Sequence, residues 1–253
     1  MSLDPTPLAK AVTRLAEQLD SLQSVRTALI TAHPDDELLF FGPLLEHHEA
    51  SRDPLHVFCL TDGGWDGARR TIDPELGALR ITEFHSLSRC FTNVYTVYLQ
   101  SPLQDDPTRP WDSQILNVVL YSIATLPALR AVYTFDSRGA SGHRHHCQLG
   151  RAAQAFHFGC PVLLLRTHSW FESPFKKSSP TEIKYLARDR TRLRQAFATV
   201  YPSQRAWYRT LLLYFGRSVR GITFSVYSSP RQRQTSPVSG AVDGTAYAEV
   251  PLS

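Results

Sequence analysis

Apolar runs long enough to cross a membrane are missing from the sequence. No stretch approaches the roughly 18–20 uninterrupted apolar residues that a spanning helix requires. The opening stretch, MSLDPTPLAKAVTRL, contains Asp4 and two early prolines in place of an apolar centre, so it does not resemble a secretory signal. We therefore expect the chain to carry neither a signal peptide nor a membrane anchor of its own.

Cysteine is also scarce and is not arranged for cross-linking. The four cysteines form no C-x-x-C pair, and three of them sit among apolar neighbours, as buried free thiols do. This pattern favours a reducing compartment and predicts no disulfide framework. The residues concerned are Cys59, Cys90, Cys147 and Cys160.

A strong charge of either sign is the third feature that is lacking. The formal net charge is only +4, which is too small to indicate nucleic-acid binding, and we predict no nucleic-acid partner. The balance is compatible with an anionic partner such as a phospholipid headgroup, although a mixed solvated surface is the simpler interpretation. With 42% apolar residues in 253, the chain suits one large domain or two small ones.

Short apolar runs alternate with longer segments of helical character. The runs cover 28–32, 57–61, 94–99, 131–135 and 162–165, and 222–227 is a further candidate strand. The helical segments are 36–50, 74–90, 112–126 and 146–158. Strands that are apolar throughout and alternate with helices are typical of a parallel sheet covered on both faces. We predict an α/β, Rossmann-like fold whose mostly parallel sheet has helices on both faces and a ligand site at the carboxyl ends of its strands.

The two ends of the chain differ in character from its middle. Residues 7–24 place apolar side chains three or four positions apart, which predicts an amphipathic helix. From residue 228 onward the chain is rich in Ser, Pro, Gly and Gln without periodicity, which is typical of a disordered tail. We therefore divide the chain into an N-terminal helix (1–24), one domain (25–227) and a tail (228–253).

Two polar clusters follow two of the predicted strands. The first is AHPDDE at 32–37, and the second is DSRGASGHRHH at 136–146. Because ligands in open α/β sheets bind beyond the carboxyl ends of the strands, we expect both clusters to contribute to one site.

The residue types in these clusters suit a catalytic metal. Histidine and aspartate are ligands of Zn²⁺, and a catalytic zinc uses three protein ligands and one water. His33, Asp36 and His146 can supply the ligands, although ligand type alone does not separate Zn²⁺ from Fe²⁺. Asp35 is then a candidate general base, and His143 can polarise a carbonyl, stabilise an oxyanion or protonate a leaving amine.

Each cluster also has a structural interpretation. The first is compatible with a turn in which Asp35 or Asp36 caps a helix, and the histidines of the second are compatible with a solvated loop. The occurrence of both clusters directly after strands favours the metal site.

These motifs resemble the PIG-L/LmbE-like de-N-acetylase family, whose marks are A-H-P-D-D-E and a later G-H-x-x-H. The eukaryotic branch, which acts on N-acetylglucosaminyl-phosphatidylinositol in GPI-anchor synthesis, is the most similar. Its further marks match TFD with GASGH at 134–143, DDP with WD at 105–112, RITE at 80–83 and SQRAWYR at 203–209. The resemblance implies zinc on His33, Asp36 and His146, with Asp35 as base and His143 as second catalytic group. It also implies a peripheral location on the cytoplasmic face of the endoplasmic reticulum.

The resemblance extends to residues around the centre, each with a structural alternative. It implies that Arg80 and Asp105 contact substrate, although Arg80 and Glu83 have the spacing of an exposed helix pair and Asp105 could cap a helix. Asp136 is expected to orient a site histidine, and the alternative is that it accepts backbone bonds within its own loop. His145 is expected to point away from the site.

Two departures from the branch leave the substrate open. The usual membrane-spanning helix is lacking, and segment 63–74 is long, so Arg69, Arg70 and Arg80 all stay candidates for the substrate contact. Trp65 and Trp111 are either core residues or an aromatic rim. Segment 206–220 mixes arginines with aromatics, which is compatible with a core helix or with a membrane-surface contact. Alternative functions are deacetylation of a soluble GlcNAc conjugate and non-catalytic carbohydrate or inositide binding.

Overall fold

The computed structural model describes residues 7–22, 24–167, 182–204 and 220–227. The predicted tail at 228–253 and nearly all of the segment 206–220 lie outside the described residues. The proposed division into helix, domain and tail therefore stays a prediction.

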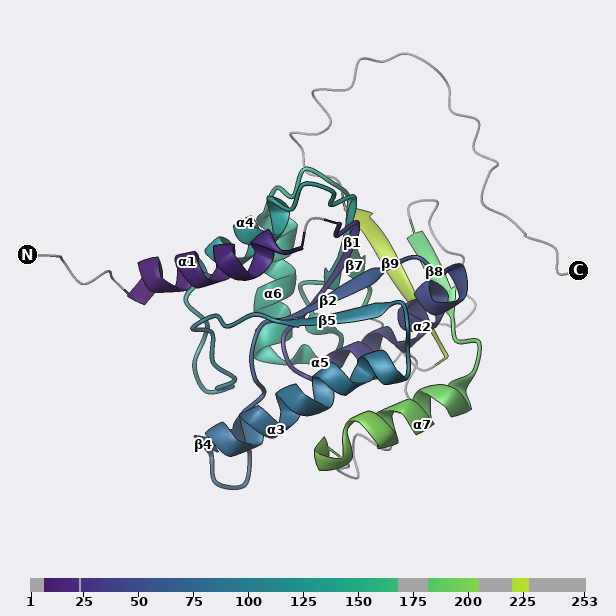
Figure 1. Cartoon of the computed structure of the whole chain (residues 1–253), viewed down its shortest axis with the longest axis horizontal. Coiled ribbons are helices and arrows are strands. Elements are labelled where there is room, and N and C mark those ends of the chain that lie inside the picture. The colour runs from purple at the N-terminus through teal and green to yellow at the C-terminus, as the bar shows by residue number, and fades with distance from the viewer. Residues whose placement is uncertain (1–6, 23, 168–181, 205–219, 228–253) are drawn as a thin grey trace, which may run out of the picture.

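A seven-stranded sheet forms the centre of the molecule and confirms the predicted fold class (Figure 1). Its strand order is β5-β2-β1-β6-β7-β9-β8. The first five strands in that order run parallel, and β9 is antiparallel to both β7 and β8. The strands are β1 (Thr27–Thr31), β2 (Leu55–Cys59), β5 (Val94–Tyr98), β6 (Ala131–Phe135), β7 (Val162–Leu165), β8 (Glu182–Leu186) and β9 (Gly221–Tyr227).

Helices cover both faces of this sheet, as the sequence predicts. Helices α1, α4 and α6 pack together on one face, whereas α2, α3 and α7 lie on the other (Figure 1). The helices are α1 (Pro7–Asp20), α2 (Asp36–Ser51), α3 (Pro74–His85), α4 (Ser113–Ala124), the short α5 (Gly139–Gly142), α6 (Arg144–Ala155) and α7 (Arg190–Val200). Two 3₁₀ turns, η1 (Ser86–Arg89) and η2 (Pro202–Gln204), follow α3 and α7. None of the helices in the described part of the chain has the length and apolar character needed to cross a bilayer.

Aspartates cap the N-termini of three helices. Asp73, Asp112 and Asp189 each accept hydrogen bonds from two backbone amides in the first turn of α3, α4 and α7, respectively. Since Asp112 caps α4, the alternative interpretation of Asp105 as the cap of that helix is wrong.

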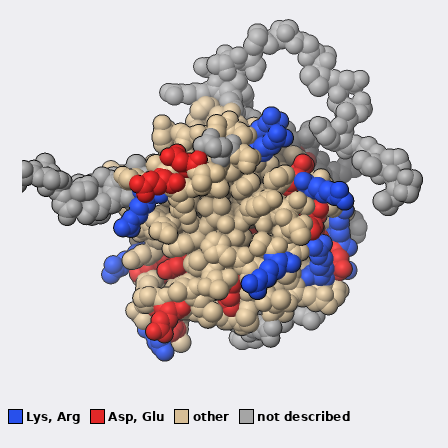
Figure 2. All heavy atoms as spheres, in the orientation of Figure 1, with Lys and Arg blue, Asp and Glu red and all other residues tan. Residues whose placement is uncertain are grey.

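Charged side chains are dispersed over the face shown in Figure 2. Lys and Arg lie mostly toward its rim, interspersed with Asp and Glu, and uncharged residues fill much of the centre. Among the described residues, this face therefore offers no continuous basic surface.

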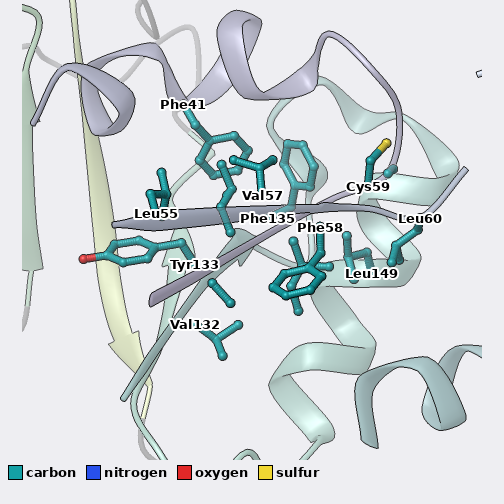
Figure 3. Close-up of a cluster of buried hydrophobic side chains, with 14 of the residues drawn as sticks. Phe41, Leu55, Val57, Phe58, Cys59, Leu60, Val132, Tyr133, Phe135 and Leu149 are labelled. Carbon is teal, nitrogen blue, oxygen red and sulfur yellow. The ribbon is translucent and has the colours of Figure 1, made fainter. Parts of the chain in front are cut away.

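The apolar core lies between the sheet and its helices (Figure 3). Strand β1 is buried from Ala28 onward and β2 is buried throughout, because parallel strands in the middle of such a sheet are covered on both sides. Phe41 of α2 packs edge-on against Phe135 of β6, with ring centroids 5.0 Å apart. The core thus fixes the end of β6, directly before the second polar cluster.

The sequence did not predict strand β8, helix α7 or a short hairpin, among other elements. Strand β8 consists of half-buried and exposed residues, since it lies at the edge of the sheet, and it contains no apolar run. Helix α7 follows it. The hairpin consists of two very short strands, β3 (Trp65–Asp66) and β4 (Thr71–Ile72), within the long segment 63–74. Strands of two residues are too short to show a periodicity.

Candidate functional site

The two polar clusters meet where two adjacent parallel strands end. Strand β1 leads through the first cluster into α2 on one face of the sheet, and β6 leads through the second cluster into α6 on the other face. Such a reversal of connection leaves a crevice at the carboxyl ends of the strands, where α/β proteins bind ligands.

Three buried side chains converge at this crevice. Nδ1 of His33 lies 3.2 Å from Nε2 of His146, which in turn lies 3.1 Å from Oδ1 of Asp36. Oδ2 of Asp36 lies 3.5 Å from Nδ1 of His33. A tetrahedral metal with bonds of roughly 2.0–2.1 Å separates its ligand atoms by about 3.3–3.4 Å. The donor types and their spacing therefore fit a divalent transition metal.

Asp36 also fixes the turn that carries His33. Its Oδ2 accepts hydrogen bonds from the backbone amides of Ala32 at 3.1 Å and His33 at 2.9 Å. Burial opposes ionisation of this carboxyl, but His146 and His33 lower its pKa well below the ordinary value. The Asp36 carboxylate is thus anionic and could bind a metal, and hydrogen bonds from the surrounding backbone fix its position.

The second nitrogen of His33 faces a carboxylate. Nε2 lies 3.1 Å from Oδ1 of Asp105 and 3.3 Å from Nδ1 of His145. Burial alone would lower the pKa of His33, yet Asp105 and Asp36 raise it to about 10. Imidazoles that bind metals usually have such a carboxylate on the other ring nitrogen, where it fixes the tautomer and the ring orientation.

His146 is oriented by its own loop. Its ring stacks on Phe135 at 4.1 Å between centroids, and Nδ1 lies 3.1 Å from the carbonyl oxygen of Gly139. Gly139 adopts a φ of 65°, and a Cβ there would lie 2.7 Å from the backbone nitrogen of Cys147. Asp136 accepts hydrogen bonds from the amides of Gly139 at 2.9 Å and Arg138 at 3.0 Å and from the amide of Thr167 at 2.7 Å, so it holds the loop and supports His146 indirectly, through Gly139.

Asp35 has an unusual backbone and a cationic neighbour. It is 3% exposed and has a φ of 103°, a region that favours glycine and costs other residues about 1–3 kcal/mol. Its Oδ2 lies 3.3 Å from Nη2 of Arg80. Although Asp35 precedes α2 at the N-cap position, its side chain makes no capping hydrogen bond, so the cap interpretation does not account for it.

Arg80 is buried rather than exposed. Its guanidinium donates to the carbonyl oxygens of Gly63 at 2.6 Å and Pro34 at 2.5 Å. Glu83, three positions later, accepts instead from the amide and hydroxyl of Ser203, at 2.8 and 2.6 Å. The alternative interpretation of Arg80 and Glu83 as an exposed ion pair is therefore wrong.

His143 is half-buried beside the two other histidines. Its ring centroid lies 4.7 Å from that of His33 and 4.9 Å from that of His146. Burial, followed by His33 and His146, lowers the pKa of His143 to about 3, so its imidazole is neutral near pH 7. Nδ1 of His143 is buried and has no hydrogen-bond partner among the described residues, which leaves it for a bound molecule.

These side chains line one cavity of about 460 Å³. Its wall includes Asp35, Arg80, Asp105 and His143 and also Trp65, which the β3–β4 hairpin supplies. The remaining lining residues are His33, Asp36, Leu39, Phe40, Gly67, Leu76, Pro107, Ser141, His146 and Gln204. A volume of this size accommodates a small molecule such as a sugar.

His145 and Gln204 lie in positions that the sequence did not predict. His145 is fully buried, contacts His33 and stacks on Trp111 with ring centroids 4.4 Å apart, so it does not point away from the site. This stack also accounts for Trp111 as a core residue. Gln204 reaches the cavity from η2 at the end of α7. Its only signal in the sequence is the SQ pair at 203–204.

Comparisons with known proteins agree with this geometry. Residues 28–157 match the family described as PIG-L: GlcNAc-PI de-N-acetylase. A bovine N-acetylglucosaminyl-phosphatidylinositol de-N-acetylase is 28% identical over 209 residues, which cover 77% of this chain and 81% of the relative. A probable enzyme of the same name from Schizosaccharomyces pombe is 26% identical over 212 residues, covering 74% and 81%.

A solved structure shows the same fold. N,N'-diacetylchitobiose deacetylase from Pyrococcus horikoshii superposes with a TM-score of 0.59 at 17% identity, covering 89% of this chain and 94% of that one. The family match includes both polar clusters and the strands that carry them. The chain belongs to the PIG-L, or GlcNAc-PI de-N-acetylase, family.

Proposed function

We propose that the chain removes the N-acetyl group of N-acetylglucosaminyl-phosphatidylinositol by hydrolysis, giving glucosaminyl-phosphatidylinositol and acetate in GPI-anchor synthesis. The observation that carries this proposal is the convergence of His33, Asp36 and His146 at one wall of a cavity that Asp35 and His143 also line. The family match and the bovine and yeast relatives support the substrate.

The donor set fits one divalent metal, which we propose to be zinc, with Fe²⁺ as the alternative. His33 offers Nδ1, His146 offers Nε2 and Asp36 a carboxylate oxygen. When bound, the metal would polarise the scissile carbonyl and lower the pKa of water.

In the proposed reaction, Asp35 acts as the general base. Its carboxylate accepts a proton from the attacking water, and Arg80, 3.3 Å away, stabilises the carboxylate in its anionic form. Water adds to the acetyl carbonyl carbon, after which the bond between that carbon and the sugar nitrogen breaks. The proton taken by Asp35 is returned to the departing amine, and acetate is released.

His143 is proposed as the second catalytic group. It lines the cavity with a buried Nδ1 that has no partner among the described residues. As a neutral imidazole it can donate one hydrogen bond to the developing oxyanion, or accept and pass on the amine proton. Such a combination of base and donor has no purpose in a pure binding module, which argues against the non-catalytic alternative.

Arg80 and Asp105 remain proposed substrate contacts, although both also have other partners. Arg80 donates to two backbone carbonyls, and Asp105 faces His33. Arg69 is engaged by Asp66 and Asp73 at 3.3 and 3.1 Å, while Arg70 at the hairpin tip is exposed. We therefore propose Arg80 as the arginine within the cavity, acting near the reacting centre.

We further propose a peripheral location on the cytoplasmic face of the endoplasmic reticulum. A surface contact with the membrane would let the sugar headgroup enter the cavity while the lipid chains stay in the bilayer.

The test is acetate release by purified protein from vesicle-bound N-acetylglucosaminyl-phosphatidylinositol, with and without a chelator. We expect release that the chelator abolishes and that added Zn²⁺ or Fe²⁺ restores. Release only from a water-soluble GlcNAc conjugate would favour the soluble-substrate alternative. No release from either substrate by metal-loaded protein would contradict the proposal.

A further inference from the structure

We propose that Glu37 is a positioning residue for the base: it holds the backbone amide of Asp35 in the conformation that directs the Asp35 carboxylate into the cavity. The inference rests on the proposed function, because it takes Asp35 as the base. Glu37 does not line the cavity, and the reaction described above does not use it.

The conformation of Asp35 requires a local constraint. Its φ of 103° and ψ of −21° place it in the left-handed region, which residues with a Cβ rarely adopt. The side chain that follows from this backbone lies beside Arg80 and lines the cavity. Were Asp35 to relax to an ordinary φ, the direction of its Cα–Cβ bond would change and its carboxylate would leave this position.

Glu37 supplies that constraint from two positions along the chain. Its Oε2 accepts the backbone N–H of Asp35 at 3.2 Å. The Glu37 side chain is fully buried within the first turn of α2, so water does not compete for this hydrogen bond. The contact joins the side chain of Glu37 to the one backbone amide whose orientation changes with the φ of Asp35.

A second contact fixes Glu37 itself. The hydroxyl of Tyr201 donates to Oε1 of Glu37 at 2.5 Å, and Tyr201 is fully buried at the end of α7. Glu37 therefore cannot rotate away from Asp35 without losing this bond. The chain Tyr201–Glu37–Asp35 connects the end of α7 to the base.

The competing interpretation is that Glu37 merely ties α7 to α2 and stabilises the fold. Helix α2 offers a matched comparison, because Glu46 is also buried and also accepts two hydrogen bonds, from the backbone amides of Arg188 at 2.7 Å and Asp189 at 3.0 Å. Glu46 thus ties the same helix to the segment before α7, but it does not line the cavity. A structural role predicts the same consequences for both residues.

The experiment compares Glu37→Leu, Glu37→Gln and Glu46→Leu in the full-length, metal-loaded protein. We expect Glu37→Leu to lower kcat at least about tenfold with unchanged KM and metal content, because small displacements of a catalytic group have large effects on rate. Glu37→Gln should stay within about threefold of wild type, since its amide oxygen can accept the Asp35 N–H and its NH₂ can donate to the Tyr201 oxygen. Glu46→Leu should lower the melting temperature and leave kcat unchanged.

Amide hydrogen exchange gives a readout that does not depend on turnover. The N–H of Asp35 should be protected in wild type and in Glu37→Gln and should exchange faster in Glu37→Leu. Any of three results would overturn the proposal. They are unchanged protection of the Asp35 amide in Glu37→Leu, a kcat for Glu37→Leu equal to that of Glu46→Leu, and a loss of kcat fully matched by a loss of metal. If Glu37→Leu does not fold, Tyr201→Phe takes its place, and unchanged kcat and Asp35 exchange in that variant would have the same consequence.

The two proposals can fail separately. Absence of acetate release from the lipid substrate by wild-type protein would end the proposed function, whereas the exchange measurement would still decide whether Glu37 holds the Asp35 amide. Acetate release by wild type together with unaltered activity of folded Glu37→Leu would leave the function in place and remove only the positioning role.

Discussion

Oδ1 of Asp105 lies 3.1 Å from Nε2 of His33, the ring nitrogen that does not face Asp36 and His146. Asp105, which is predicted to contact the substrate, therefore also contacts His33, a proposed metal ligand, on the side of the ring away from the metal. Asp105→Asn should weaken metal affinity by roughly 10–100-fold, because the amide is a poorer partner for the imidazole N–H. Competition with a chromogenic chelator measures this, and wild-type affinity in the variant would limit Asp105 to substrate binding.

Substitution of the proposed base and substitution of a proposed metal ligand should have different effects on activity and metal content. Asp35→Asn should retain the metal and lose about 10²–10⁴-fold in kcat, the range of a general acid–base contribution. His146→Ala should lose the metal itself. Metal analysis by mass spectrometry beside the acetate assay distinguishes the two effects. Full activity of Asp35→Asn would show that another group takes the proton.

Metal binding should release a proton from His33. The pKa of His33 in the metal-free protein is raised to about 10, so near pH 7 the imidazole is protonated and must lose that proton to bind a metal through Nδ1. Calorimetric titration with Zn²⁺ in buffers of different ionisation enthalpy should report about one proton released per metal. No proton release from wild type near pH 7 would contradict the predicted ionisation.

The raised pKa of His33 also predicts how the stability of the metal-free protein depends on pH. The folded pKa of about 10 lies above the ordinary 6.5, so the contribution of His33 is fully present below about pH 6.5 and is lost as pH rises through about 10. Wild type should therefore lose more of its free energy of unfolding than His33→Gln between near pH 7 and pH 10. Urea unfolding of both chelator-treated proteins at these pH values measures the difference, and parallel pH profiles would refute it.

Trp65 is expected to contribute to sugar binding. It is half-buried and lines the cavity, and Oδ2 of Asp105 accepts its backbone N–H at 3.4 Å. Trp65→Ala should raise KM for the GlcNAc substrate roughly tenfold with little change in kcat, whereas Trp65→Phe should keep most of the affinity because it retains an aromatic face. Equal KM values for wild type and Trp65→Ala would place Trp65 outside the sugar site.

Much of the fold follows from the pattern of apolar residues alone. The five parallel strands were predicted to within about two residues, because each is rich in apolar residues and four of them, β1, β2, β6 and β7, are buried almost throughout, whereas β5 is only partly buried at the edge of the sheet. Strand β8 was not predicted, since Ile183, Lys184 and Leu186 are exposed at the edge of the sheet and carry no such signal.

The site was predictable only where its residues lie close together in the sequence. Side chains near His33 and near His146 stand out because each group follows a strand. The contact of Tyr201 with Glu37 spans 164 positions, and that of Ser203 with Glu83 spans 120. Such pairs depend on how α7 packs against α2 and how η2 packs against α3, which local periodicity does not encode. His145 was misjudged because its neighbour Arg144 begins α6, so the direction of His145 depends on where that first turn starts.

His33 and His146 are separated by 113 positions along the chain, yet their ring nitrogens lie 3.2 Å apart. A metal bound to both would close a loop that contains β2, β5, α3 and α4, and would act on the unfolded chain as a cross-link does. Because the four cysteines are free, the metal would supply the kind of cross-link that a disulfide supplies elsewhere, in addition to the pairing of β1 with β6. Metal supply would then raise the free energy of unfolding as well as support activity.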